Sequence, residues 1–208
     1  MQRPARRIVL AAALAAQTSA PAWAARPPWP AAPGDMSLGN PKAPVQVVEY
    51  LSLSCSHCAH FNETVFPAFR AKYVDKGRVY YTVRELLTAP ENVAAAGFLM
   101  ARCAGPSKYF AVLDQVFRSQ PRWQAEPIKP IFLEIAGKNG LSEAQFEACV
   151  TNAAALTALE GRIQYAVETD KVDSTPTFFV NGAKVGGDQI PTLADLSAAV
   201  AKASKGRR

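Results

Sequence analysis

The sequence predicts an α/β fold into which an all-helical subdomain is inserted, and three observations carry this prediction. Residues 45–54 form an apolar, β-branched run that leads into Cys55 and Cys58, and a helical pattern follows. Residues 90–172 show helical periodicity throughout, which is too long for one crossover helix. Strand-like residues return at 177–185 before a closing helix. We therefore expect a central mixed sheet flanked by helices, interrupted by a helical insertion.

The first 24 residues are typical of a signal peptide. Their basic start consists of Arg3, Arg6 and Arg7. Residues 8–16 are an alanine-rich apolar run that is too short to span a bilayer. Residues 22–24 fit the small-x-small cleavage pattern, so we expect a cut after Ala24 and export by the Sec or the twin-arginine route. An uncleaved amphipathic anchor is the alternative for this segment.

Removal of that segment changes the charge balance of the chain. The formal net charge falls from +6 to +3, because 20 of the 23 lysines and arginines remain against 17 acidic residues. The remaining sequence has no basic stripe interleaved with aromatic residues, so we expect no nucleic-acid partner. All four cysteines remain. An even number of cysteines in an exported chain indicates an oxidising compartment and possible disulfides.

A strand, a helix and a second strand are predicted before the insertion. Residues 25–44 are proline-rich and are expected to be extended, without forming a domain. The helix is predicted at 58–76, with a kink at Pro67 because proline lacks an amide hydrogen. The second strand is predicted at 78–84, and the strand–helix–strand spacing makes it parallel to the first.

The insertion is predicted to comprise residues 89–172, and the α/β domain residues 45–88 and 173–204. Gly-Pro, Gln-Pro and Asn-Gly pairs divide the insertion into helices. Ser142 and Gln145 have the spacing of a capping box. Four or five helices are expected, at 91–103, 108–119, 127–139, 142–152 and 155–171.

Two strands and a helix are predicted to close the chain. The strands at 177–180 and 183–185 flank Asn181-Gly182, a pair that favours a two-residue hairpin turn. The helix is predicted at 191–203. Its apolar face consists of Leu193, Leu196 and Val200.

Cys55 and Cys58 lie where the first helix is predicted to begin. Backbone amides at a helix start have no partners within the helix, and the helix dipole adds partial positive charge there. A thiolate at Cys55 would be stabilised by both, and the thiolate is the reactive species in disulfide exchange. The ring of His57 could donate a hydrogen bond or positive charge to that sulfur. Cys58 would lie one turn further in and be less exposed.

Other interpretations of these residues stay open. Cys55 and Cys58 could form half of a zinc site with His57 or His60, but a structural zinc takes four ligands and the other cysteines lie far away, so we expect no metal. Either histidine could also be a plain surface residue. Glu49 has apolar neighbours and is expected to be buried, with a surface position on an edge strand as the alternative.

Thr175-Pro176-Thr177 comes just before the predicted hairpin. Proline cannot donate to a sheet ladder, so Pro176 belongs at the start or edge of a strand. Only about 5–6% of such peptide bonds are cis, so spacing alone leaves the isomer open.

Together, these motifs resemble the thioredoxin fold, and the helical insertion resembles the DsbA-type thiol:disulfide oxidoreductases. The resemblance covers about residues 37–203 and rests on Glu49 six positions before Cys55, on the Cys-x-x-Cys motif and on residues 174–182. It implies that Cys55 is the exposed nucleophile and that Cys58 is the buried resolving cysteine.

The same resemblance implies three further roles. Pro176 would be a cis-proline beside the disulfide, and Thr175 would offer its backbone to an extended substrate. Glu49 would assist proton transfer at Cys58. The chain departs from the best-known member in having Ser-His between the cysteines and Thr175 in place of valine, and both positions tune the redox potential in the family.

Cys103 and Cys149 lie on predicted helices of the insertion. A structural disulfide between them is the favoured interpretation, and it would close a loop of about 46 residues. A second redox pair and two free thiols are the alternatives.

The sequence as a whole predicts a periplasmic thiol:disulfide oxidoreductase that introduces disulfide bonds into exported proteins. We expect a monomer with no cofactor beyond the Cys55–Cys58 disulfide, acting on unfolded or reduced exported proteins. The resemblance implies reoxidation by a quinone-linked membrane oxidase of the DsbB type. The alternatives are a disulfide reductase or isomerase, and a chaperone-like binding protein whose Cys-x-x-Cys is structural.

Overall fold

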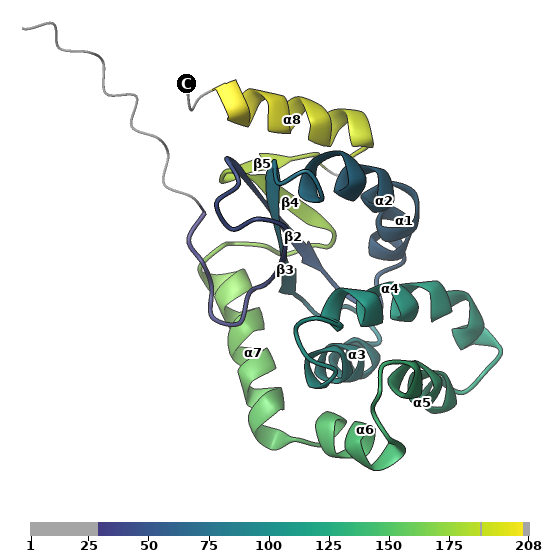
Figure 1. Cartoon of the computed structure of the whole chain (residues 1–208). Coiled ribbons are helices and arrows are strands. Elements are labelled where there is room, and N and C mark those ends of the chain that lie inside the picture. The colour runs from purple at the N-terminus through teal and green to yellow at the C-terminus, as the bar shows by residue number, and fades with distance from the viewer. Residues whose placement is uncertain (1–28, 188, 206–208) are drawn as a thin grey trace, which may run out of the picture.

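The computed structural model describes residues 29–187 and 189–205, so the predicted signal peptide at residues 1–24 lies outside the described residues. Within them the predicted α/β fold with a helical insertion is confirmed (Figure 1). Five strands form one mixed sheet in the order β1–β3–β2–β4–β5. The strands are β1 (Met36–Leu38), β2 (Val45–Leu51), β3 (Val79–Glu85), β4 (Thr177–Val180) and β5 (Ala183–Val185).

The strand directions agree with the predicted spacing, with one addition. β2 and β3 are parallel, while β4 is antiparallel to both β2 and β5. β1 lies in the segment predicted only to be extended, and it pairs antiparallel with β3. A three-residue strand has too few residues to show an alternating pattern, and its partner lies about 45 positions later.

The prediction of one continuous helix at 58–76 is wrong. The structure has α1 (Ser56–Thr64), α2 (Phe66–Phe69) and a π-helical segment η1 (Arg70–Val74). The break at Val65 lies two residues before Pro67, whose ring and missing amide hydrogen interrupt the preceding turn. The helix is therefore interrupted near Pro67, where the sequence predicted only a kink.

The insertion contains five α-helices, the larger of the two numbers predicted (Figure 1). Its first helix, α3, has the predicted bounds, and the other four end within three residues of theirs. The predicted capping box at Ser142 and Gln145 begins α6. The helices are α3 (Glu91–Cys103), α4 (Tyr109–Ser119), α5 (Ile128–Lys138), α6 (Glu143–Val150) and α7 (Ala153–Glu168), with a short 3₁₀ helix η2 (Gln120–Gln124) after α4.

The hairpin and the closing helix also agree with the sequence prediction. Asn181 and Gly182 have φ angles of 45° and 78°, the left-handed backbone that a type I′ turn requires at both central positions. Helix α8 (Leu193–Lys205) buries Leu196 and Val200.

Alternation along β2 gives the two faces of the sheet different surroundings. Val47, Glu49 and Leu51 point to one face, where a large apolar core continues into the insertion. Val48 and Tyr50 point to the other face and pack in a smaller cluster with residues of α7. Glu49 therefore points into the core on the side where α1 lies.

Glu85, at the end of β3, ties the insertion to the sheet. Its side chain has no exposed surface and accepts hydrogen bonds from Arg102 of α3, Tyr109 of α4 and Arg162 of α7, at 2.7, 2.8 and 2.7 Å. Since Leu51 is the register partner of Glu85, the three helices are anchored beside the end of β2.

Candidate active site

The two cysteines of the Cys-x-x-Cys motif lie where β2 gives way to α1. Cys55 is the N-cap residue of α1, and its sulfur accepts a hydrogen bond from the Cys58 amide at 3.4 Å. Cys55 is half-buried, while Cys58 has no exposed surface. Both thiols are free, so the structure holds the dithiol form. Only Cys55 can be reached readily by a second molecule.

The pKa values of the two thiols are shifted in opposite directions. A hydrogen bond from the Cys58 thiol lowers the pKa of Cys55 to about 5, and burial opposes this. The Thr175 hydroxyl and the backbone amides of Cys58 and His57 also contribute to this low value. Burial raises the pKa of Cys58 well above its ordinary value. The pair therefore combines a stable thiolate at Cys55 with a protonated thiol at Cys58.

His57 interacts with the Cys55 sulfur through its backbone amide and not through its ring. Its side chain is exposed, and within the described part of the chain its ring makes no hydrogen bond. The contribution of His57 to the thiolate comes from its backbone amide. His60 is also exposed.

Sheet pairing brings Thr175 and Pro176 to the cysteines. Tyr50 is the register partner of Thr177, so the residues before β4 lie beside those that follow β2. The Thr175–Pro176 peptide bond is cis. The Cys55 sulfur lies 3.4 Å from the Thr175 carbonyl oxygen, to which it donates a hydrogen bond only in its protonated form. The Thr175 hydroxyl is buried and, among the described residues, has no hydrogen-bond partner at ordinary distance, but it is close enough to the Cys55 sulfur to contribute to the low pKa of that thiol.

Glu49 is buried beneath the pair, with 4% of its surface exposed. Burial raises its pKa to about 8, although a hydrogen bond from Tyr81 acts in the opposite direction. The negative charge of Glu49 contributes to the raised pKa of Cys58. Glu49 is therefore protonated near neutral pH and electrostatically coupled to the buried thiol.

A cavity of about 560 Å³ reaches Glu49 and Tyr81 from the side of the insertion. Phe66 of α2 and Phe117 of α4 line its walls, and Asp114 is also in its lining. Glu49 is thus close to a space that water can enter, although little of its own surface is exposed.

Hydrogen bonds also hold the turn between β2 and α1. The residues outside the turn that make these bonds were not predicted from the sequence. The Thr88 amide and hydroxyl lie 3.0 Å from the Ser52 hydroxyl, and Ser54 donates to the Thr88 carbonyl at 2.6 Å. Gln120 donates to the carbonyl of Leu53 at 2.9 Å. No sequence motif marks Thr88, Gln120 or Tyr81. The only available signal for Tyr81 is its hydroxyl, which lies between the apolar Val79 and Val83 on one face of β3.

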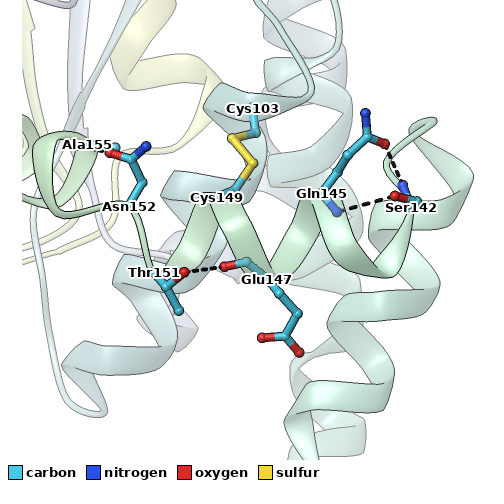
Figure 2. Close-up of a disulfide and its surroundings, with 8 residues drawn as sticks. All are labelled: Cys103, Ser142, Gln145, Glu147, Cys149, Thr151, Asn152 and Ala155. Atoms are coloured by element: carbon cyan, nitrogen blue, oxygen red, sulfur yellow. Dashed lines mark hydrogen bonds between the residues drawn. A yellow bond between two sulfur atoms is a disulfide. The ribbon is translucent and has the colours of Figure 1, made fainter.

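Cys103 and Cys149 form a disulfide between α3 and α6 (Figure 2). Their Cα atoms are 6.2 Å apart, and the bond closes a loop spanning 46 positions. Cys103 is exposed and Cys149 half-buried. This pair belongs to the insertion and contributes no group to the surroundings of Cys55.

Within residues 29–187 and 189–205, no cluster of three or more His, Cys, Asp or Glu side chains has the geometry to hold a metal ion. In that same part of the chain, no helix is both long enough and apolar enough to cross a membrane.

Comparison with known proteins places these features in a wider group. A family model described as Thioredoxin matches residues 31–202. A Rickettsia conorii protein named as a protein-disulfide oxidoreductase is 33% identical over 171 residues, which cover 81% of this chain and 60% of that protein. The chain thus spans about 60% of the length of this relative. Disulfide bond formation protein D of Bacillus subtilis is 26% identical over 103 residues, which cover 49% of this chain and 46% of that protein.

Two solved structures have a similar fold. Alpha-DsbA1 of Wolbachia pipientis matches with a TM-score of 0.75 and 26% identity, covering 85% of this chain and 94% of that one. Oxidised BdbD of Bacillus subtilis matches with a TM-score of 0.74 and 20% identity, covering 85% and 96%.

Proposed function

This chain belongs to the thioredoxin family, and from that premise we propose that it is a protein thiol:disulfide oxidoreductase of the DsbA type, which introduces disulfide bonds into exported proteins. The observation that carries the proposal is the difference between the two thiols. Hydrogen bonds lower the pKa of Cys55 to about 5, while burial raises that of Cys58. A thiolate that is stable in the reduced enzyme makes the enzyme disulfide easy to reduce, and therefore oxidising.

The cycle begins with the Cys55–Cys58 disulfide. A substrate thiolate attacks the Cys55 sulfur, and the bond between the two enzyme sulfurs breaks. The products are a substrate–Cys55 mixed disulfide and a Cys58 thiolate. Burial makes this thiolate unfavourable, so it takes up a proton. Glu49 is the proposed donor because it is protonated near neutral pH and coupled to Cys58.

The second step releases the oxidised substrate. A second thiolate of the substrate attacks the substrate sulfur of the mixed disulfide, and Cys55 leaves as its stable thiolate. The substrate loses two electrons, and the enzyme pair gains them. Cys55 lies against the Thr175 carbonyl, and we propose that Thr175 and Pro176 bind the extended substrate chain beside it.

Localisation and reoxidation are part of the same proposal. The enzyme is exported to the periplasm after cleavage behind Ala24, and the Cys103–Cys149 disulfide supports an oxidising compartment. It acts as a monomer on reduced exported proteins, with the Cys55–Cys58 disulfide as its redox group. A quinone-linked membrane oxidase of the DsbB type reoxidises the pair.

Two measurements on the mature chain test this function. The redox equilibrium with glutathione should lie toward the dithiol enzyme, as for a strong oxidant, and Cys55→Ala should abolish the oxidation of a reduced, unfolded substrate protein. A potential close to that of thioredoxin would favour a reductase. Aggregation suppression that survives in Cys55→Ala, without any exchange activity in the wild type, would favour a chaperone-like binding protein.

A further inference from the structure

Gln120 brings the helical insertion into contact with the turn that carries Cys55. It follows α4 and is the first residue of η2. Its side-chain amide nitrogen donates to the Leu53 carbonyl at 2.9 Å and lies 3.3 Å from the Cys55 carbonyl. Among the described residues of the insertion, no other side chain hydrogen-bonds to residues 52–58.

The backbone that carries Gln120 is held in place on both sides. Ser119 donates to the Val116 carbonyl at 2.7 Å and accepts from the Trp123 indole at 3.0 Å. The Trp123 ring packs edge-on against Phe132 of α5. Gln120 is half-buried between these anchors, so its amide is a fixed donor rather than a side chain sampling solvent.

The two carbonyls that Gln120 reaches determine the geometry of the helix start. The Cys55 carbonyl also accepts the first hydrogen bond of α1, from the Ala59 amide at 3.1 Å. The Leu53 carbonyl has no other partner in the described part of the chain. With both carbonyls fixed, the backbone of Cys55 keeps the orientation in which its sulfur lies over the Cys58 amide.

We propose that Gln120 is a positioning residue for disulfide exchange, through which the helical insertion holds the Cys55 turn and keeps its sulfur over the amides at the start of α1. This rests on the proposed function and adds a residue to it. Thr88 holds the same turn through Ser52 and Ser54, but of these two side chains it is Gln120 that reaches the Cys55 carbonyl. Its amide nitrogen thus lies 3.3 Å from the carbonyl oxygen of the residue that carries the thiolate.

The test replaces the donor and keeps the length of the side chain. In Gln120→Met, the ratio of dithiol to disulfide enzyme in a glutathione buffer should fall about threefold to tenfold, the range that one hydrogen bond contributes to an equilibrium. The pKa of the Cys55 thiol, followed by ultraviolet thiolate absorbance, should rise in parallel. The matched control is Gln115→Met on α4, where Gln115 accepts from Asn139 instead, and both quantities should remain at their wild-type values.

Variants of different charge at position 120 distinguish a specific effect of Gln120 on the Cys55 thiol from a general loss of structure in the turn. Gln120→Lys keeps a donor and adds positive charge, whereas Gln120→Glu removes the donor and adds negative charge. The pKa of Cys55 should therefore increase in the order Lys, Met, Glu. Any other order overturns the proposal, as does a wild-type value in Gln120→Met or an equal change in Gln115→Met.

The same measurements distinguish failure of this inference from failure of the proposed function. If the wild-type Cys55 thiol titrates like an ordinary cysteine, the oxidase function fails whatever the variants do. If the wild type has a low pKa that none of the Gln120 variants changes, only the role of Gln120 fails. Thermal unfolding of each variant in the disulfide form shows whether it is folded, and the Lys and Glu variants decide the question if Met disrupts the turn.

Discussion

The phenolic hydroxyl of Tyr81 donates a hydrogen bond to the carboxyl group of Glu49 beneath the active-site thiols. Both side chains are nearly inaccessible to solvent and line the same cavity between the sheet and the insertion. Burial raises the pKa of Glu49 to about 8, and the Tyr81 hydrogen bond limits that rise. The pair thus provides a protonated acid next to Cys58 at neutral pH, with its proton affinity adjusted by one hydroxyl group.

We predict that Glu49→Gln slows the first exchange step on the order of a hundredfold, because the departing Cys58 thiolate loses its proton donor. The wild-type rate, expressed per thiolate of the small thiol, should fall as pH rises through about 8, where Glu49 ionises, and the variant should lack that decline. The measurement is the rate of mixed-disulfide formation with a small thiol over this pH range. If Glu49→Gln keeps the decline seen in the wild type, the decline is caused by the ionisation of another group.

Tyr81→Phe should move that decline to higher pH. The substitution keeps the ring in the core and removes the hydrogen bond that lowers the pKa of Glu49. Tyr80→Phe is the matched control, since the neighbouring side chain on β3 points to the other face of the sheet. The same pH–rate profile checks both variants, and an equal movement in Tyr80→Phe would contradict a specific role for Tyr81.

Glu49 also makes stability depend on pH. Its pKa is raised from 4.5 to about 8 in the folded protein, so its contribution to stability is fully present below pH 4.5 and is lost as pH rises through about 8. We predict that Glu49→Gln gains stability relative to the wild type across this window. Urea unfolding of both dithiol proteins at about pH 4.5 and pH 8 measures the difference. A difference that does not change with pH would show that Glu49 ionises normally.

Cys58→Ala should raise the pKa of the Cys55 thiol. The hydrogen bond from the Cys58 thiol is the largest cause of the low value, and the backbone amides and Thr175 remain in the variant. Ultraviolet thiolate absorbance against pH measures it, and the remaining thiol should still form a mixed disulfide that the variant cannot resolve. An unchanged pKa would mean that the helix start and Thr175 stabilise the thiolate without the Cys58 thiol.

The Cys103–Cys149 disulfide is predicted to act on stability and not on exchange. Its removal by Cys103→Ala with Cys149→Ala should decrease the free energy of unfolding by about 4 kcal/mol, from the entropy of a loop spanning 46 positions. Substrate oxidation and the pKa of Cys55 should remain unchanged. Denaturant unfolding and the thiolate titration check the two halves of this prediction, and a changed pKa would reveal a redox role for the second pair.

Local sequence predicted the elements whose signals are local. Helix α3 follows Pro90 and ends before Gly105-Pro106, so its limits are marked in the chain itself. Asn181-Gly182 likewise determines the hairpin, because the turn requires left-handed backbone at both residues. Helix α1 begins at Ser56, two residues before its predicted start at residue 58, and Cys55 is its N-cap residue.

Features that depend on distant residues could not be predicted in this way. Strand β1 exists because β3 offers it an edge, and Tyr81 matters because the parallel register places it near Glu49. The sequence predicted that the ring of His57 could reach the sulfur, but the backbone amide does so, since adjacency in sequence does not determine which atom faces Cys55. Gln120 lies 65 positions from Cys55 and has no motif around it.

Glu85 has a consequence for any attempt to build chimaeras from this fold. One carboxylate without exposed surface holds donors from three different helices of the insertion. A chimaera that takes the helical insertion from a relative would need to keep all three donors. Otherwise Glu85 would have to be replaced at the same time. If neither is done, an unpaired negative charge would be left on a side chain without exposed surface, at the end of β3 beside the end of β2.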